Sequence, residues 1–226
     1  MSITINQIYN FESKLTKLAR TQRYTDGLVL INRLLNTHGM LREILAQKAF
    51  FLYHYAAYLR SVGRQTKKRR TLITQNFRDA VNICKQIINK STEPRDRSLL
   101  NVRIYLAQIY AMNGNGTGAK KIAKITYNKF PSSLTAERAA DVYRLLNDFR
   151  GAIYWYKRAI KLAKKPDEKM IAVIGLAVTY MKNNMNDLAL KNAVKALQIS
   201  RLSKRNMNIT LLKQTLCAHF PQLVTC

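Results

Sequence analysis

The chain has 226 residues, and its 47% hydrophobic content is typical of a globular protein and too high for a disordered one. Lysine and arginine number 39 against 12 aspartates and glutamates, a formal net charge of +27. That charge attracts acidic proteins, nucleic acid or anionic lipid surfaces, although a compositional bias of the genome is an alternative explanation. The longest apolar run, residues 170–181, is too short to span a bilayer as a helix.

Helical periodicity runs through almost the whole sequence, and no segment alternates with period two over a useful length. Turn-forming clusters interrupt the pattern at short intervals, as in NGNGTG at 113–118 and FPSS at 130–133. The segments between these clusters predict about eleven helices, near residues 3–20, 24–36, 41–60, 74–90, 99–113, 117–129, 133–146, 150–164, 168–183, 186–199 and 205–218. The expected fold class is therefore all-α.

Residues 148–166 mix aromatic and basic side chains, which can indicate a stacking surface for nucleic acid. Helical spacing separates the two kinds. One face carries Ala152, Tyr156, Ala159 and Ala163, and the opposite face carries Tyr154, Lys157, Arg158, Lys161 and Lys165. This separation favours an amphipathic packing helix over a stacking surface.

Three stretches repeat one arrangement of small and aromatic residues. An alanine precedes a tyrosine by three positions in each stretch, at Ala107 and Tyr110, Ala140 and Tyr143, and Ala177 and Tyr180. A second alanine follows each tyrosine by nine positions, at Ala119, Ala152 and Ala189. Small residues at these places let two helices approach closely, and the tyrosine fills the gap to the next pair.

This arrangement resembles the tetratricopeptide repeat, a helix–turn–helix unit of about 34 residues. The segments LAQIY and LAVTY resemble its first helix, and AIYWY resembles its second. The resemblance implies a right-handed α-solenoid of about five helical hairpins with a C-terminal capping helix.

The resemblance also suggests how the chain is divided. Residues 1–99 are expected to form divergent hairpins, in which Leu18 and Gly27 keep the frame of the repeat, with a basic insertion near 61–73. Residues 100–203 hold the three recognisable repeats. Residues 204–226 are expected to form the capping helix and a tail.

In this family the first helices line a concave groove that receives a peptide. The leading hypothesis is a non-enzymatic scaffold that binds an acidic protein or peptide, and the alternative is a helical-repeat protein that binds RNA or DNA. The groove candidates are the first-helix positions off the packing face: Asn101, Ile104, Tyr105, Gln108, Met112, Arg138, Asp141, Arg144, Val178 and Lys182. Some relatives clamp a carboxylate here, but Glu137 and Asp141 disfavour that version.

The segment RQTKKRR at 64–70 is a separate candidate for binding anions or nucleic acid. Its cations are Arg64, Lys67, Lys68, Arg69 and Arg70. A solvated loop explains the segment equally well, and either reading places it outside the packed helices.

No motif indicates an enzyme, a cofactor or a metal. The segment GNGTGAKK at 114–121 has Ala119 where a phosphate-binding loop needs its second glycine, so a turn explains it better. The histidines His38, His54 and His219 have no ligands at metal spacing, and His54, in an aromatic-rich helix, is expected to be a core or groove residue. Cys84, Cys217 and Cys226 cannot all pair and the first residues lack a secretory pattern, so a cytoplasmic protein is expected. Nothing indicates the oligomeric state.

Overall fold

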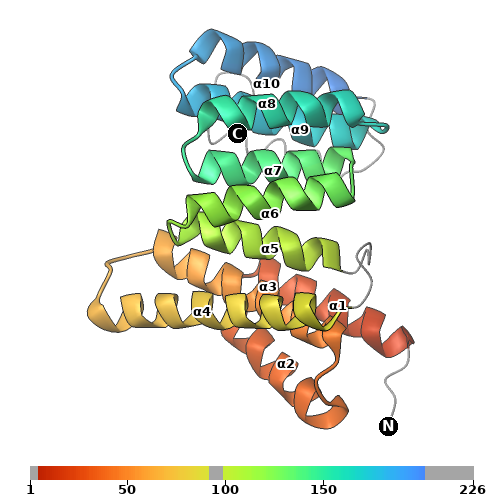
Figure 1. The fold of residues 1–226 in the computed structure, drawn as a ribbon, viewed down its shortest axis with the longest axis vertical. Coiled ribbons are helices and arrows are strands. Elements are labelled where there is room, and N and C mark those ends of the chain that lie inside the picture. The colour runs from red at the N-terminus through yellow and green to blue at the C-terminus, as the bar shows by residue number, and fades with distance from the viewer. Residues whose placement is uncertain (1–4, 92–98, 202–226) are drawn as a thin grey trace. The chain divides into compact units, whose positions relative to one another are not determined.

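The structure is a computed structural model that describes residues 5–91 and 99–201. This part of the chain is all-α, as predicted, and contains no strand. The described helices are α1 (Ile5–Arg20), α2 (Tyr24–His38), α3 (Arg42–Ser61), α4 (Lys67–Lys90), α5 (Leu99–Met112), α6 (Gly116–Lys129), α7 (Ser133–Leu145), α8 (Phe149–Leu162), α9 (Pro166–Lys182) and α10 (Asn186–Ser200) (Figure 1). The capping helix expected at 205–218 lies outside the described residues.

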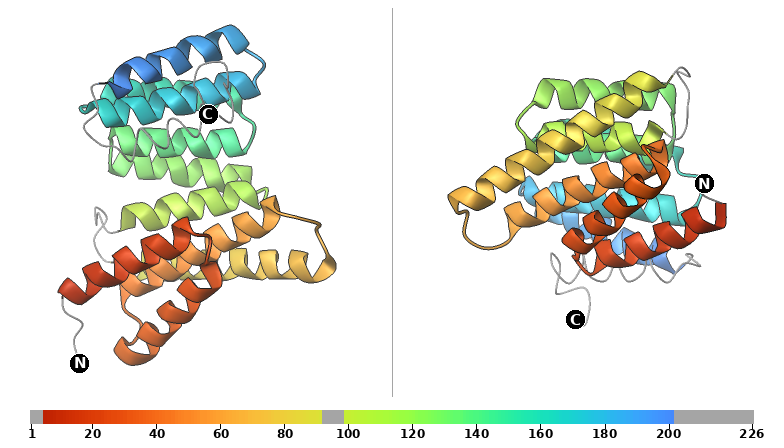
Figure 2. Two further views of the ribbon diagram at one scale, coloured as in Figure 1. Left: turned by 180° about the vertical axis from the view of Figure 1, so that it is seen from behind. Right: turned by 90° about the horizontal axis from the view of Figure 1, so that it is seen from below.

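The chain forms two compact units, Met1–Ile109 and Tyr110–Cys226, and the boundary between them falls within α5. Unit 1 contains α1 to α4 and most of α5. Its closest helix pair is the antiparallel hairpin of α3 and α4. Unit 2 contains the end of α5 and helices α6 to α10, in which the hairpins α7–α8 and α9–α10 stack on each other (Figure 2). No described helix has both the length and the apolar character needed to cross a membrane.

Four hairpin turns share one hydrogen-bond geometry. In each, the residue before the second helix donates its N–H to the carbonyl five positions earlier, as in the helix-terminating Schellman motif. These bonds, all 2.9 Å long, run from Arg23 to Leu18, Asn115 to Tyr110, Asp148 to Tyr143 and Met185 to Tyr180. Leu18 therefore holds the place of the later tyrosines, as the frame of the repeat predicts.

Each of these turns needs one residue with left-handed backbone. The residues that supply it are Gln22, Gly114, Asn147 and Asn184, with φ of 58°, 79°, 57° and 58°. Asn115 and Asp148 then cap the second helices, because their side chains accept the N–H of Gly118 and of Gly151 at 2.9 Å. The segment GNGTGAKK thus contains the hairpin turn, at Gly114 and Asn115, followed by the start of α6.

The small residues of the repeat form the centre of the packing. Ala119, Ala152 and Ala189 are each 0% exposed, so all three lie fully inside the packing between helices. Gly27 holds the same place in unit 1, where a Cβ would lie 2.0 Å from Cε1 of Phe51. The Phe51 ring therefore packs on the bare backbone of α2, and the divergent hairpin follows the packing rule of the later repeats.

The stretch 148–166 is an amphipathic helix, as predicted. Tyr156 is 1% exposed and Tyr154 is 56% exposed. Trp155 is also buried, under the guanidinium of Arg158, which lies 5.9 Å from the centre of the indole ring. Trp155 and Arg158 therefore take part in packing between helices, whereas Tyr154 faces solvent.

Helix α4 is longer than the sequence predicts, because it begins at Lys67 rather than near residue 74. The Thr66 hydroxyl caps the helix by accepting the N–H of Arg69 at 3.3 Å. The side chain of Arg69 returns to α3, where Nε donates to the Leu59 carbonyl at 2.9 Å. The expected basic insertion is therefore a short loop, residues 62–66, followed by two further turns of helix. The expectation that Lys67 to Arg70 lie outside the packed hairpins was wrong.

Candidate functional site

The first candidate site is a pocket within unit 1, with a volume of about 410 Å³. Helices α1, α3 and α5 contribute most of its walls, and Tyr24 at the start of α2 completes them. Leu15 and Phe51 are buried and form its base. The polar and aromatic side chains that face the space are Thr16, Arg20, Gln47, Phe50, His54 and Tyr105.

Aromatic rings hold the shape of this pocket. Phe50 and His54 lie one turn apart on α3 and so share a face, with ring centres 4.2 Å apart. Phe50 also contacts Tyr105 of α5, at 5.5 Å between centres. Tyr53 stacks on the same tyrosine at 6.4 Å, so the position of Tyr105 is fixed by two neighbours on α3. The half-buried rings of Phe50, His54 and Tyr105 offer a preformed apolar surface.

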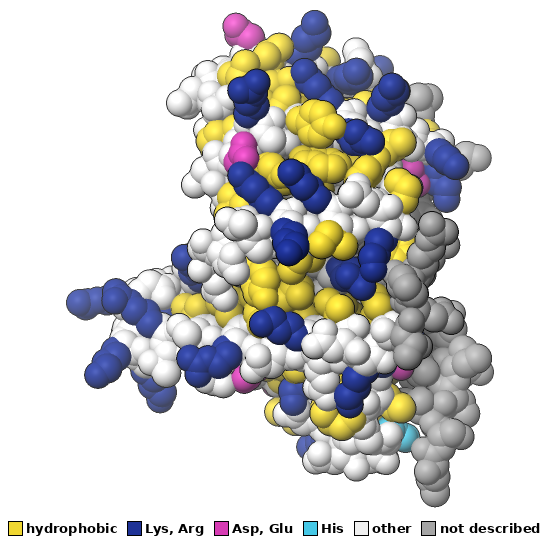
Figure 3. All heavy atoms as spheres, viewed as in Figure 1, with side chains coloured by type: hydrophobic (Ala, Val, Ile, Leu, Met, Phe, Trp, Pro, Cys, Tyr) yellow, Lys and Arg dark blue, Asp and Glu magenta, His cyan; other side chains and the backbone are white. Residues whose placement is uncertain are grey.

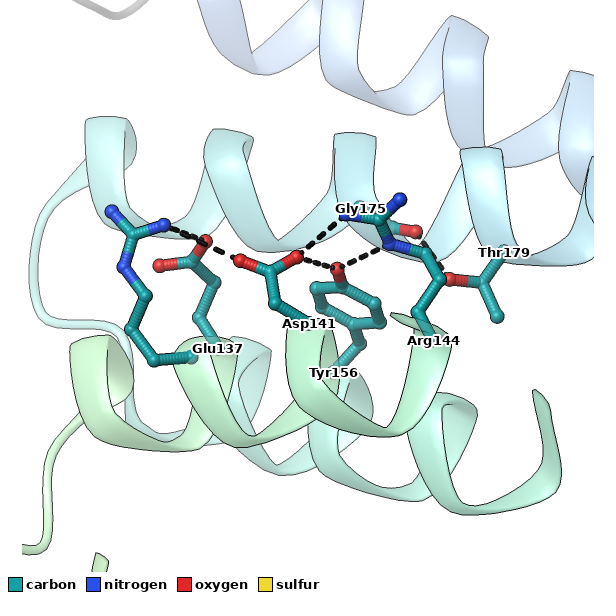
Figure 4. Close-up of polar contacts among 7 residues, drawn as sticks. Glu137, Asp141, Arg144, Tyr156, Gly175 and Thr179 are labelled. Atoms are coloured by element: carbon teal, nitrogen blue, oxygen red, sulfur yellow. Dashed lines mark hydrogen bonds and ion pairs between the residues drawn. The ribbon is translucent and has the colours of Figure 1, made fainter. Parts of the chain in front are cut away.

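The second candidate site is a row of charged residues along α7, in unit 2. Asp141 accepts hydrogen bonds at Oδ1 from the Tyr156 hydroxyl at 2.6 Å and from Nη2 of Arg144 at 2.9 Å. Nη1 of Arg138 lies 3.3 Å from Oδ2 of Asp141 and 3.4 Å from Oε1 of Glu137. Asp141 therefore pairs with both arginines of this helix, and Glu137 lies beside Arg138 (Figure 4).

Gly175 of α9 makes room for this arrangement. A Cβ at Gly175 would lie 2.3 Å from Cε1 of Tyr156, so no larger residue leaves space for the ring. The phenol passes beside the backbone of α9 to reach Asp141, as Figure 4 shows. Nearby, Thr179 donates its hydroxyl to the Gly175 carbonyl at 2.7 Å. The ring of Tyr156 thereby joins α7, α8 and α9.

Burial changes the acid–base behaviour of the row on α7. It raises the pKa of Glu137 to about 7, although the nearby Arg138 opposes the shift. Burial also raises the pKa of Tyr156 well above its ordinary value, and the Asp141 charge adds to the effect. For Arg144, desolvation is outweighed by Tyr156 and Asp141, which raise its pKa. Tyr156 and Arg144 thus keep their protons and act as hydrogen-bond donors to Asp141.

Comparison with known proteins identifies the fold. No protein-family profile and no curated protein matches the sequence. Among solved structures, TTC0263, a thermophilic TPR protein in Thermus thermophilus, is 19% identical, covers 92% of this chain and 98% of its own, and gives a TM-score of 0.60. A Podosopora anserina putative kinesin light chain with nearly identical TPR-like repeats is 13% identical, covers 87% and 97%, and gives 0.56. This chain has the tetratricopeptide-repeat fold.

In the tetratricopeptide-repeat fold, α1, α3, α5, α7 and α9 are the first helices of successive hairpins. The pocket of unit 1 is built mainly on three of them. Of the groove candidates named from sequence, only Tyr105 lines this pocket. Asn101 is exposed on the same helix, Gln108 is half-buried, and Ile104 is buried at 7% exposure.

The other groove candidates belong to unit 2. Met112 ends α5 and is half-buried. Arg138, Asp141 and Arg144 form the ion-paired row on α7. Val178 of α9 is buried at 8% exposure, whereas Lys182 is exposed at the end of that helix. The structure therefore groups Arg138 with Asp141 and Arg144 and places Val178 in the packing.

The basic candidates divide into two kinds. Arg64 in the loop and Lys67, Lys68 and Arg70 in the first turn of α4 are exposed. Arg69 is half-buried and bonded to α3, so its first role is to hold the hairpin together. As for metals, the described residues contain no group of three or more His, Cys, Asp or Glu able to hold an ion.

Sequence reasoning missed the α3 side of the pocket. Gln47 and Phe50 were not named as candidates, and His54 was expected only as a core or groove residue of the aromatic-rich segment AFFLYHYAAYL. The signal was the aromatic pair Phe50 and His54 at helical spacing on a first helix. This pair was overlooked because α4 begins earlier than predicted, so the spacing of the repeat is hard to recognise in the α3–α4 hairpin.

Proposed function

We propose that this chain is a non-catalytic scaffold that binds a peptide segment of a protein partner in the pocket of unit 1. One observation carries the proposal: first helices α1, α3 and α5 enclose about 410 Å³ with half-buried aromatic side chains on its walls. Preformed concave sites with aromatic walls and a few polar groups are typical of ligand binding. The tetratricopeptide-repeat fold agrees with a scaffold that presents such a site.

The lining predicts the chemistry of the ligand. Phe50, His54 and Tyr105 would surround an apolar or aromatic side chain. Gln47 and Thr16 offer hydrogen bonds to a peptide backbone, and Arg20 supplies positive charge at the wall. Among the described residues, no carboxylate lines the pocket. These features favour a peptide with an aromatic or aliphatic anchor beside an acidic residue, which agrees with the acidic partner suggested by the net charge of +27.

The row of charged residues on α7 is the weaker of the two candidate binding sites. An acidic peptide there would have to replace Asp141 as the partner of Arg144 and Arg138. A ligand would therefore gain less from these cations, because both already pair with Asp141 within unit 2.

The proposal can be tested by selecting peptides from a displayed random library on the full chain and measuring their affinities calorimetrically. Tyr105→Ala should weaken the selected peptides about tenfold or more, because truncation of an aromatic anchor typically costs more than about 1.4 kcal/mol. The substitution Arg20→Glu should weaken acidic peptides and spare neutral ones.

Lys17→Glu is the matched control for charge, since Lys17 is exposed on the same helix and does not line the pocket. Arg138→Ala is the control for the row on α7. If Lys17→Glu weakens binding as much as Arg20→Glu, or Arg138→Ala as much as Tyr105→Ala, the pocket of unit 1 is not the binding site.

A further inference from the structure

Helix α4 has two faces of opposite character over its whole length of 24 residues. The inner face packs on α3 through Ile73, Phe77, Ala80 and Cys84, all buried. The outer face carries Lys67, Arg78 and Lys85, which are exposed and recur close to one line along the helix, because 11 and 18 residues correspond to about three and five turns. The cations thus form a row on the side of α4 that faces away from its core.

A shallow groove with a volume of about 550 Å³ follows the N-terminal half of this face. Lys67, Arg70 and Arg78 supply its positive charge, and Gln65, Thr71 and Thr74 are neutral hydrogen-bonding residues beside them. Of the residues that the structure describes, no aromatic, aliphatic or acidic one lines the groove. Figure 3 shows lysine and arginine side chains gathered around this end of unit 1.

These cations have no carboxylate partner in the part of the chain that the structure describes: Lys67, Arg70 and Arg78 enter no ion pair there. The acid next to the groove, Asp79, accepts a hydrogen bond from Nε2 of Gln75 at 2.8 Å. These three side chains therefore present their full charge to solvent.

The position of the charge also works against the helix itself. Four consecutive cations, Lys67 to Arg70, occupy the first turn of α4, and no acidic residue accompanies them. The N-terminus of a helix carries partial positive charge, so each cation there is unfavourable unless an anion binds nearby. Local helix stability does not explain these first-turn cations, whereas an external anion would offset their charge.

The lining indicates which kind of anion. Lysine, arginine, threonine and glutamine are among the residues that contact phosphate and sugar in nucleic-acid complexes. A protein partner would find no apolar anchor among the described lining residues, and a single strand would find no ring there on which to stack its bases. We propose that the outer face of α4 binds duplex nucleic acid through its phosphate backbone, without reading the sequence.

The length of the row suits a duplex. Lys67 and Lys85 are 18 residues apart, which corresponds to about 27 Å along a helix, or about eight base pairs at 3.4 Å each. The chain would then carry two binding surfaces in unit 1, the pocket on the first helices and the basic row on a second helix. The two can be inactivated separately, because they share no residue.

The test compares the triple variant Lys67→Gln, Arg70→Gln, Arg78→Gln with the wild-type chain by fluorescence anisotropy. The probes are a 20-base-pair DNA duplex, an RNA duplex of equal length, a single strand and poly-glutamate, each at several salt concentrations. Wild type should bind a duplex more tightly than the single strand or poly-glutamate. Because log K falls by about 0.9 per log unit of salt for each phosphate neutralised, the triple variant should lower that slope by nearly three and weaken binding more than tenfold at low salt.

The matched control is Lys157→Gln, Lys161→Gln, Lys191→Gln, which removes equal charge from exposed positions of unit 2. Its slope should stay close to that of wild type. Arg69 is left unchanged because it supports the α3–α4 hairpin. The single variant Arg78→Gln should lower the slope of log K against log salt concentration by about one. The proposal would be overturned if the triple variant and the control lost equal affinity for the duplexes. It would also be overturned if the wild-type chain bound poly-glutamate as tightly as it binds both duplexes.

Discussion

The hydroxyl of Tyr156 donates a 2.6 Å hydrogen bond to Oδ1 of Asp141, so the second helix of a hairpin satisfies an acid on the first. Tyr156 is 1% exposed and its ring passes beside Gly175 of the next hairpin. One aromatic residue thus joins a polar row to the packing of three helices. Asp141 is therefore held in place by partners within unit 2.

Removing that hydroxyl should weaken unit 2. Tyr156→Phe is expected to lower the free energy of unfolding by about 1–3 kcal/mol, because hydrogen bonds to charged groups contribute about that much and Asp141 keeps only its arginine partners. Urea denaturation measures the change. Tyr154→Phe is the matched control, since Tyr154 is 56% exposed and should change the free energy by less than about 0.5 kcal/mol. Equal effects from both substitutions would contradict the role given to Tyr156.

A methyl group at Gly175 should be costly. Glycine to alanine inside a helix normally stabilises by about 0.5–1 kcal/mol, but here the new Cβ would meet the Tyr156 ring at 2.3 Å. Gly175→Ala is therefore expected to lower the free energy of unfolding by about 1–3 kcal/mol. In Gly116→Ala the nearest atom, on Leu146, would lie at 3.4 Å, an ordinary contact. A Gly175→Ala protein as stable as Gly116→Ala would show that the ring does not occupy this gap.

Glu137 should make stability depend on pH. Its pKa is raised from 4.5 to about 7 by burial, so the unfolded chain loses this proton at lower pH than the folded one. Stability should fall as the pH rises from about 4.5 to about 7, by on the order of 3 kcal/mol, and change little above that range. Glu137→Gln removes this group and should flatten the profile in the same window. A variant whose free energy of unfolding runs parallel to that of wild type from pH 4.5 to 7 would refute the assignment.

Neighbouring arginines on α4 should behave differently. Arg69→Gln removes the bond to the Leu59 carbonyl and is expected to lower the free energy of unfolding by about 1–2 kcal/mol. Arg70→Gln removes an exposed cation from the positive end of a helix and should be neutral or slightly stabilising. Thermal denaturation of the two variants side by side distinguishes these roles. An Arg70→Gln protein less stable than Arg69→Gln would reverse the assignment.

Much of the fold could be predicted because its signals are local. The alanine and tyrosine spacings located the hairpins of residues 100–200, and Ala119, Ala152 and Ala189 proved fully buried. Even the divergent first hairpin was placed correctly through Leu18 and Gly27. The early start of α4 was missed, because a run of Lys and Arg resembles a solvated loop until Thr66 is seen to cap it and Arg69 to bond back to α3.

The candidate sites were harder to predict than the fold. Sequence spacing places a residue on a helix face but does not show which charges pair, so it did not show that Arg144 and Tyr156 both donate to Asp141. The pocket of unit 1 depends on side chains from helices far apart in the chain, such as Phe50 and Tyr105. Only tertiary structure brings such residues together.

The central claim is that a peptide ligand occupies the pocket of unit 1. It is tested most directly by amide chemical-shift mapping of the full chain during titration with a peptide from the library selection. We predict that the largest shifts will fall on residues around the pocket, with Gln47, His54 and Tyr105 among them. Largest shifts on α7 and α9, around Arg138 and Lys182, would contradict the claim and return the binding site to unit 2.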